Sequence, residues 1–296
     1  MRNKDHEIQY ILMLIPGMIL LFVFSIVPMF GIIIAFQKFV PAKGFFGSAF
    51  VGLDNFKLAF TFPDVNQVFF NTIYIAVLKI VTGIIAAVVF ALLLNEVRVS
   101  SFKRIIQTIT YLPHFLSWVI VSVMLTNILS YTGIFNRIIG MLGGEPIIFL
   151  ASNTWFRPIL IISDIWKGFG YGAIIYLAAI TNIDLNLYEA AEIDGAGRMG
   201  KIWYITLPGI KSTVVLMSTL ALGNVLNAGF EQIFTMYNPV VYTTSDIIDT
   251  YVYRMGLVKL QFSFGTTVGL LKSVVSFILI VLSYKLADKY AGYRIF

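Results

Sequence analysis

Long apolar stretches dominate the pattern of this chain, and polar residues gather between them. Each of six stretches is long enough to cross the hydrocarbon core of a bilayer, which takes about 20 apolar residues in a helix. The six stretches are residues 10–36, 69–94, 106–129, 158–181, 209–230 and 265–284. The pattern therefore predicts an all-α integral membrane protein with six transmembrane helices.

The first stretch, residues 10–36, is expected to stay in the mature chain. Its apolar core is too long for a secretory signal peptide, and no small-residue cleavage pattern follows it. We therefore interpret it as an uncleaved first transmembrane helix.

Composition supports a membrane protein. Hydrophobic residues make up 58% of the 296 residues, charged residues make up 12%, and the mean hydropathy is +0.87. A soluble domain carries about 25% charged residues. The apolar stretches therefore need lipid as their solvent.

Lysine and arginine are unevenly distributed between the predicted loops, and cytoplasmic loops carry the excess of such cations. With the N-terminus inside, the inner segments hold ten of these residues and the longer outer segments hold seven. The inner segments are 1–9, 95–105, 183–208 and 285–296, and the outer ones are 37–68, 130–157 and 231–264. The bias predicts a multi-pass protein with cytoplasmic termini, and it explains the net charge of +6 without a nucleic-acid partner.

The side chains that most often bind metals or act as nucleophiles are scarce. There is no cysteine, which removes disulfides, thiol catalysis and cysteine-based metal sites. The two histidines, His6 and His114, are far apart in the sequence. We expect a packing role for His114, no bound metal and no catalytic residue, which argues against a membrane-embedded enzyme.

The longest polar stretch, LYEAAEIDGAGRMGKIWYITLP at residues 187–208, contains near matches to two nucleotide-binding patterns. The dinucleotide fingerprint needs a preceding strand, but helix-forming residues precede Gly195. The P-loop needs a hydroxyl residue after its lysine, and Ile202 occupies that position. The stretch is instead interpreted as a short cytoplasmic helix, a glycine turn, a second short helix at 199–206, and Pro208 in the first turn of the next span.

The same stretch resembles the EAA signature of the permease subunits of binding-protein-dependent ABC importers. That signature is E-A-A, three residues, G, nine residues and I-x-L-P. The matching residues are Glu189, Ala190, Ala191, Gly195, Ile205, Leu207 and Pro208. Asp194, which precedes the glycine, is similar to the sugar-permease version of the motif.

The resemblance extends over nearly the whole chain. The segment 50–56, FVGLDNF, resembles the segment that precedes the core of sugar permeases. The segments 230–234, 237–239 and 249–254 resemble the polysaccharide branch of these permeases, which is called LplB-like.

The resemblance implies the type I ABC importer transmembrane-domain fold. It also implies a transport subunit that is not an enzyme and that binds no cofactor, since ATP and Mg are used by a separate partner. The expected partners are a second homologous permease subunit in a heterodimer, two copies of a cytosolic ABC ATPase, an extracellular or periplasmic solute-binding protein, an oligosaccharide and membrane lipid. The location is then the cytoplasmic membrane of a prokaryote.

We expect three segments along the chain. Residues 1–66 hold the N-terminus, the first helix and an outer segment, and residues 67–285 form the permease core. The coupling loop lies at 187–208, and residues 286–296 form a cytoplasmic tail. Within the coupling loop, the residues of the EAA signature and Asp194 would contact the ATPase. Gly195 would set the turn of the loop.

Polar residues inside spans mark a candidate substrate pathway. Asp164, Lys167 and Tyr171 share one face of the fourth predicted helix at i, i+3 and i+7, with Trp166 beside them. The same spacing on the fifth helix relates these three residues: Asn224, Asn227 and Glu231. The faces would bind saccharide hydroxyl groups, with an aromatic ring stacking on a sugar.

Simpler interpretations stay open for these faces. An Asp164–Lys167 pair would neutralise itself, and asparagines would bond between helices. Lys79 and Lys272 are interpreted as packing or snorkelling cations. In the outer loops, Asp246, Asp249 and Arg254 would either contact the binding protein or lie in ordinary solvated loops.

An ion-gradient-driven secondary transporter or channel is the alternative function. It would require broken helices and buried acids at corresponding positions of two halves. Asp164 is the single clear midspan acid, so the sequence favours the ATP-driven importer, which carries an oligosaccharide or a polysaccharide fragment by alternating access.

Overall fold

The computed structural model describes the backbone of residues 4–291 and the side chains of residues 9–285 and 288. The chain divides into two compact units, which we treat one at a time. The smaller unit comprises Met1–Pro63 and Val252–Leu271, and the larger comprises Asp64–Tyr251 and Lys272–Phe296. The predicted tail at 286–296 continues the last helix to Ala291, and residues 292–296 lie outside the described residues.

The smaller unit begins with the first apolar helix. Its elements are α1 (Lys4–Leu21), α2 (Val27–Met29), β1 (Gln37–Lys38), α3 (Gly44–Gly47), β2 (Ala49–Phe50) and α4 (Asp54–Thr61). The two strands pair antiparallel, with Gln37 opposite Phe50. The Asn55 side chain donates to the carbonyls of Ala35 and Gln37 at 2.9 and 3.0 Å, which fixes α4 against the end of the first span.

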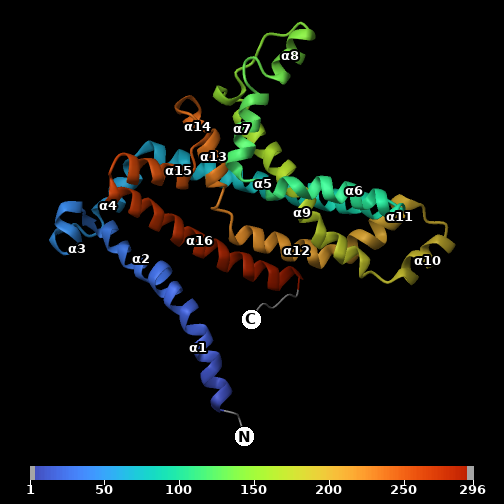
Figure 1. Cartoon of the computed structure of the whole chain (residues 1–296), viewed down its shortest axis with the longest axis horizontal. Coiled ribbons are helices and arrows are strands. Elements are labelled where there is room, and N and C mark those ends of the chain that lie inside the picture. Colours follow the sequence, from blue (N-terminus) through green and yellow to red (C-terminus); the bar gives the residue numbers. More distant parts are fainter. Residues whose placement is uncertain (1–3, 292–296) are drawn as a thin grey trace. The chain divides into compact units, whose positions relative to one another are not determined.

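The larger unit is almost entirely helical among its described residues (Figure 1). Its elements are α5 (Pro63–Asn95), α6 (Ser100–Tyr111), α7 (Trp118–Ile128), α8 (Ile134–Met141), α9 (Phe156–Thr181), α10 (Leu185–Ile193), α11 (Arg198–Lys201), α12 (Leu207–Gly223), α13 (Phe230–Met236), α14 (Tyr242–Ser245) and α15 (Ile248–Val252). The last helix, α16 (Phe262–Ala291), begins in the smaller unit and ends in the larger one.

Two prolines explain two wide, π-type turns in apolar helices. The turn at Phe22–Ile26 lies just before Pro28, and the turn at Ile202–Thr206 lies just before Pro208. Proline lacks an N–H and its ring clashes with the carbonyl four residues earlier, so the preceding turn must widen. As a result α11 and α12 form one continuous helical segment, Arg198–Gly223. The prediction of a separate short helix at 199–206 was therefore wrong.

Five helical segments in the described residues are long and apolar enough to cross a membrane. The third predicted span, 106–129, is a pair of helices bent by 101°, so the prediction of one straight helix there was wrong. A tight turn at Leu112–Phe115 contains Pro113, and Ser117 then adopts extended backbone and caps α7 by accepting from the Ile120 N–H at 3.3 Å. Counted as one span, the bent pair completes the six.

The fifth predicted span, 209–230, has different ends in the structure. It starts eleven residues earlier, at Arg198, and it stops at Gly223. Gly229 follows with a φ of 97°, in the left-handed region that glycine tolerates, and a separate helix, α13, begins after it. The apolar sequence continues past Gly223 while the helix does not.

Small residues allow close packing between the helices of the larger unit. A Cβ atom on Gly170 of α9 would lie 2.3 Å from the Thr110 carbonyl of α6, so only glycine fits that contact. One buried cluster joins α5, α9 and α12 through alanines and larger residues. Its members are Ala87, Ala91, Ala173, Tyr176, Ile180 and Ile210.

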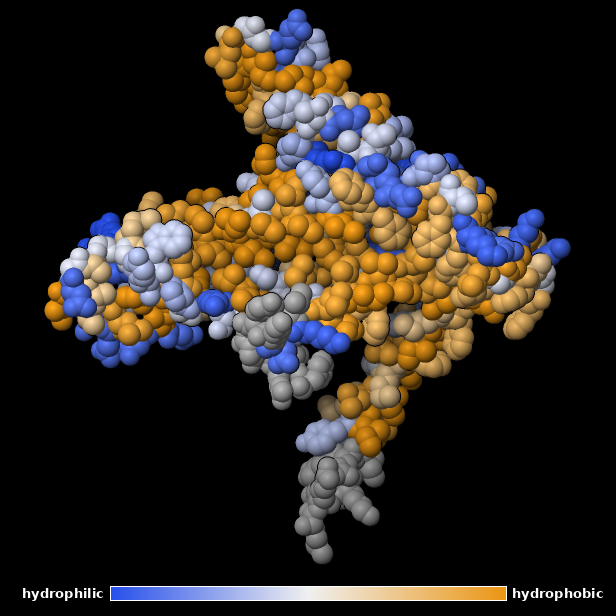
Figure 2. Space-filling view, turned by 180° about the vertical axis from the view of Figure 1, so that it is seen from behind, coloured by the Kyte–Doolittle hydropathy of each residue, from blue (hydrophilic) through white to orange (hydrophobic). Residues whose placement is uncertain are grey.

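The outer surface is apolar, as lipid requires. Figure 2 shows apolar residues over most of the visible face and hydrophilic residues in smaller patches. Large side chains such as Phe24, Ile109 and Phe277 are 73%, 65% and 67% exposed. Exposed apolar patches of this extent mark contact with lipid or with other proteins. The prediction of an all-α integral membrane protein is confirmed.

Candidate coupling elbow and polar cavity

The stretch 187–208 forms a bent elbow, which we define as α10, the turn at 194–197 and α11. It lies at one end of the larger unit (Figure 1). Gly195 has a φ of 79°. Its N–H donates to the Glu192 carbonyl at 3.1 Å, and the Ala196 N–H donates to the Ala191 carbonyl at 2.8 Å. This pair of bonds is the Schellman motif that ends helices at a left-handed glycine.

Two side-chain contacts fix the angle between the two arms of the elbow. Lys201 of α11 donates to the Glu192 carboxylate of α10 at 2.8 Å. The Tyr188 hydroxyl contacts the Thr206 hydroxyl at 2.9 Å. The hydrogen bond and charge of Lys201 lower the pKa of Glu192 below its usual value of 4.5.

The elbow presents both charged and large apolar side chains to its surroundings. Glu189, Ala190 and Asp194 are exposed, and so is Gly195. Apolar residues beside them are strongly exposed: Leu185 73%, Ile193 87%, Met199 64%, Trp203 61% and Tyr204 84%. A surface with this composition is typical of a protein contact site.

The remaining EAA residues lie at the base of the elbow. Ile205 and Leu207 are half-buried, and Leu207 packs on the buried cluster of α5, α9 and α12. Pro208 is exposed. Gly209 follows, where a Cβ would lie 2.6 Å from the Ile183 side chain. The elbow is thus joined to three membrane-spanning helices by close packing.

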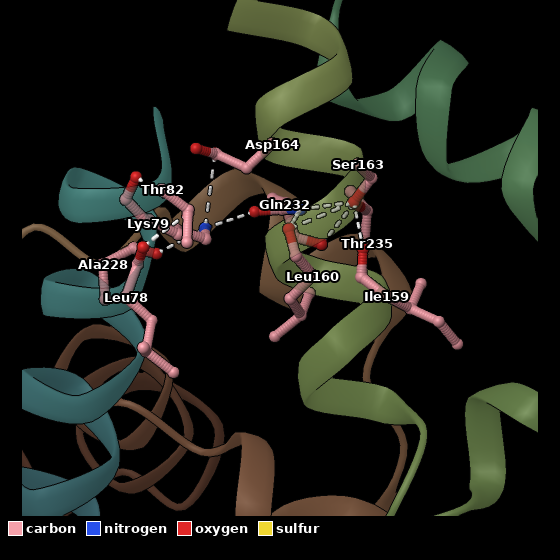
Figure 3. A network of polar contacts seen from close by, with 10 residues as sticks. All are labelled: Leu78, Lys79, Thr82, Ile159, Leu160, Ser163, Asp164, Ala228, Gln232 and Thr235. Carbon is pink, nitrogen blue, oxygen red and sulfur yellow. Dashed lines mark hydrogen bonds and ion pairs between the residues drawn. The ribbon is translucent and has the colours of Figure 1, made fainter. Parts of the chain in front are cut away.

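A second group of polar residues lies inside the helical part of the larger unit (Figure 3). The Lys79 ammonium of α5 donates to the Ala228 carbonyl at 2.8 Å and to the Gln232 side-chain oxygen. It also forms an ion pair with Asp164 of α9, at 3.5 Å. Three acceptors therefore match the three N–H donors of a lysine that is only 8% exposed.

Gln232 of α13 extends this group to α9. Its side-chain nitrogen donates to the Leu160 carbonyl at 2.8 Å and to the Ser163 hydroxyl at 2.9 Å. Gln232 itself is fully buried, so each of these bonds is made away from water. These hydrogen bonds and the ion pair connect α5, α9 and α13 to one another.

Beside Lys79 is a cavity of about 280 Å³. Its lining residues are Ala76, Lys79, Ile80, Asp164, Ala221, Asn224, Asn227, Ala228 and Gly229. Three of the predicted pathway residues, Asp164, Asn224 and Asn227, thus meet at one cavity. They reach it from α9 and from the loop of residues 224–229 between α12 and α13, which we call the 224–229 loop.

A second lysine contacts the same loop. Lys272 of α16 donates to the Asn227 side-chain oxygen at 2.9 Å and pairs with Asp249 of α15 at 2.6 Å. Lys272 is 16% exposed and Asp249 is 27% exposed. Of the two interpretations offered for Lys79 and Lys272, snorkelling was wrong, because each lysine is largely buried and paired with an aspartate, and a packing role between helices is confirmed.

The other predicted pathway residues lie elsewhere. Lys167 donates to the His114 carbonyl at 2.8 Å and lies over the Trp118 ring, so the suggested Asp164–Lys167 pair does not form. The Tyr171 ring stacks on the His114 ring with centroids 4.0 Å apart. Trp166 lines a separate apolar cavity of about 490 Å³.

Glu231 is exposed on α13, a different helix from the one predicted to carry it. The predicted shared face of Asn224, Asn227 and Glu231 was therefore wrong, since α12 ends before all three. Asp246, suggested as a contact for the binding protein, is 2% exposed and accepts from the Thr250 hydroxyl at 2.7 Å. Burial rules out that contact.

The sequence did not predict that four residues hold these polar groups together: Lys79, Gln232, Asp249 and Lys272. A lysine within a span is itself a functional signal, because a charge at that depth must find a partner. The signal was present for Lys79 and Lys272, but the partners are far away in the sequence.

Most of the chain, including the elbow and the polar cavity, matches a known protein family. The model of the family described as "Binding-protein-dependent transport system inner membrane component" matches residues 79–291. The chain belongs to this family. The permease is 44% identical to the protein LplB of Bacillus subtilis (strain 168) over 280 residues, which cover 94% of this chain and 88% of LplB.

Further relatives agree with this assignment. The polygalacturonan/rhamnogalacturonan transport system permease protein YteP of the same organism is 45% identical over 94% of the permease and 87% of YteP. A chain of a bacterial alginate ABC transporter, solved with an alginate pentasaccharide-bound periplasmic protein, has 34% identity, a TM-score of 0.89 and coverage of 99% of both chains. The predicted type I ABC importer fold is confirmed, and the permease is an inner membrane component of an ABC importer.

Proposed function

We propose that the permease carries an oligosaccharide or a polysaccharide fragment into the cell, driven by ATP hydrolysis in separate subunits. The observation that carries this proposal is the match over 99% of both chains to a subunit of an importer that was solved with a saccharide-bound periplasmic protein. The names of LplB-like relatives such as YteP, which refers to polygalacturonan and rhamnogalacturonan, support the substrate class.

The elbow is the proposed contact with a cytosolic ATPase. Its exposed apolar residues would be covered by the partner, and Glu189 and Asp194 would offer charge to it. Because Leu207 packs against the buried cluster of α5, α9 and α12, a push on the elbow would reach these three helices. Such a rigid-body movement switches a transporter when the partner contacts its two states differently.

The cavity beside Lys79 is the proposed point of contact with substrate. The Asp164 carboxylate is 35% exposed there, and Asn224 and Asn227 add amide donors and acceptors. Carboxylate and amide groups suit the hydroxyl groups of a sugar ring, which both donate and accept hydrogen bonds.

The remaining subunits follow from the same proposal. A second homologous permease would complete the membrane pathway, two ATPase copies would bind ATP and Mg, and an external binding protein would deliver the saccharide. The elbow and both termini would then face the cytoplasm, in agreement with the distribution of lysine and arginine.

The test is ATP hydrolysis by the purified complex in proteoliposomes. Binding protein loaded with fragments of polygalacturonan, rhamnogalacturonan or alginate should stimulate hydrolysis and accumulate labelled saccharide inside the vesicles. Neutral arabino- and galacto-oligosaccharides serve as the comparison set. Uptake that proceeds without ATP but follows a proton or sodium gradient would overturn the proposal in favour of a secondary transporter.

A further inference from the structure

The 224–229 loop is held by two lysines that come from different helices. Lys79 of α5 donates to the Ala228 carbonyl at 2.8 Å, and Lys272 of α16 donates to the Asn227 side chain at 2.9 Å. Their acceptors are neighbours in the sequence. Two lysines from different helices therefore bind two adjacent residues of the loop.

Each lysine is in turn held by an aspartate on another helix. Asp164 of α9 lies 3.5 Å from the Lys79 ammonium, and Asp249 of α15 lies 2.6 Å from the Lys272 ammonium. Four helices, α5, α9, α15 and α16, thus act on one short loop. A shift of any of them would change the position of the loop.

The shape of the loop is fitted to the Lys79 ammonium. Gly229 has a φ of 97°, and a Cβ there would lie 2.8 Å from the Lys79 nitrogen. Gln232, just beyond the glycine, accepts a bond from the same nitrogen and donates to Leu160 and Ser163. The ammonium therefore occupies the space next to the glycine and links the loop to α9.

The Lys79 ammonium depends on the loop as well as on Asp164. A lysine hidden from water keeps its charge only when partners replace the lost hydration. Lys79 uses the backbone carbonyl of the loop as one of those partners. Loss of the ammonium would leave the Ala228 carbonyl without that donor and Asp164 without its cation, so the loop would lose its anchor.

We propose that the Lys79–Asp164 and Lys272–Asp249 pairs position the 224–229 loop so that Asn224 and Asn227 face the saccharide hydroxyl groups. The inference rests on the proposed function for its substrate. Lys79 and Lys272 are positioning residues, which act through the asparagines. The two pairs also link the loop to four helices, so rearrangement of the helices moves the asparagines.

The absence of cysteine from the chain allows a direct test on the complete complex. An Asn224→Cys reporter is labelled with a small cationic methanethiosulfonate reagent, in the otherwise native background and with Lys79→Met or Lys272→Met added. Each lysine variant should change the labelling rate by about tenfold, because the loop is released from one anchor. Lys211→Met, at an exposed lysine on α12, should leave the rate within about twofold.

Equal labelling rates in the parent, Lys79→Met and Lys272→Met proteins would overturn the proposal. If Lys79→Met alone fails to insert, the double variant Lys79→Met with Asp164→Asn removes the uncompensated charge and should restore the protein to the membrane. Its reporter should still label at the altered rate. Lys79→Arg keeps a cation and should lie between the parent and Lys79→Met.

A functional measurement separates positioning from general stability. With galacturonan oligosaccharides as the probe, Lys272→Met should raise the half-saturating concentration of loaded binding protein and leave the maximal ATPase rate nearly unchanged. A uniform loss of maximal rate would contradict a positioning role. Should the native complex show no saccharide stimulation at all, the proposed function fails, while the labelling rates still report on the loop.

Discussion

A single backbone angle at Gly195 decides how the elbow turns. Its φ of 79° lies in the region where a side chain costs about 1–2 kcal/mol. No other atom lies within 4 Å of a Cβ built there, so the cost of a substitution comes from the backbone alone. The turn therefore depends on glycine for its angle and leaves the space around it open for a partner.

We predict that Gly195→Val reduces ATP-driven uptake at least severalfold, because it distorts the Schellman turn that ends α10. Insertion and abundance should stay normal, since Gly195 lies outside the apolar spans and has open space around it. Gly197→Val is the matched control, because Gly197 has ordinary extended backbone with a φ of −70° and open space around its Cβ position. Normal uptake by Gly195→Val, measured at equal membrane abundance, would remove the coupling role of this turn.

Gly195 and Lys79 differ in how far the sequence could predict their structural roles. The role of Gly195 depends on local backbone geometry, and the residue lies within a motif of nearby residues. Its turn could therefore be predicted, and its left-handed φ confirms the prediction. Lys79 depends on Asp164, Ala228 and Gln232, which are brought to it by the tertiary fold. No local pattern specifies those partners, and the sequence suggested Lys167 as the partner of Asp164 instead.

Close contact between α6 and α9 depends on Gly170. A Cβ there would lie 2.3 Å from a backbone carbonyl, which cannot move aside as a flexible side chain would. We predict that Gly170→Ala destabilises the purified complex by about 1–3 kcal/mol, as overpacking does. The thermal midpoint in detergent measures this loss.

Gly168, on the same helix, is the matched control for that prediction. No atom lies within 4 Å of its Cβ position. Alanine is a better helix former than glycine by about 1 kcal/mol, so Gly168→Ala should leave the thermal midpoint unchanged or raise it. Equal losses in both variants would show that the α6–α9 contact is not what limits stability.

The Glu192–Lys201 contact makes the angle of the elbow sensitive to acid. Because Lys201 lowers the pKa of Glu192, the carboxylate form stabilises the elbow above the ordinary value of 4.5, and this contribution is lost as pH falls through the lowered pKa. A spin label on a single Arg198→Cys should therefore become more mobile below about pH 4.5. Glu192→Gln should remove this pH dependence and make the label mobile at neutral pH. If the mobility of the label has the same pH profile with Glu192 and with Glu192→Gln, the Glu192–Lys201 contact does not hold the angle of the elbow.

Hydropathy predicted that the membrane helices exist but missed where they break. The apolar sequence runs through the bend at Leu112–Phe115 and past Gly223 without a change in character. The first break coincides with Pro113, and the second is followed six residues later by the left-handed Gly229, where α13 begins. Runs of apolar residues indicate that a segment lies in lipid, but they do not indicate where its helix bends or ends.

The larger unit holds the elbow, the cavity and the packing that joins them. The EAA residues at the base of the elbow lie in the same continuous segment, Arg198–Gly223, whose far end leads into the 224–229 loop. A displacement at one end of this segment therefore reaches the loop without passing through a flexible linker. That continuity, which the sequence did not predict, is the structural basis of the coupling that we propose.

The most direct measurement is site-specific cross-linking between the elbow and the ATPase in the assembled complex. A single cysteine at Ile193 or Tyr204, which are 87% and 84% exposed, is paired with cysteines on the ATPase surface. We expect efficient cross-links that arrest saccharide-stimulated ATP hydrolysis and that reverse on reduction. The elbow does not couple the permease to the ATPase if neither cysteine cross-links to the ATPase, or if a membrane-impermeant thiol reagent added outside sealed cells labels either of them.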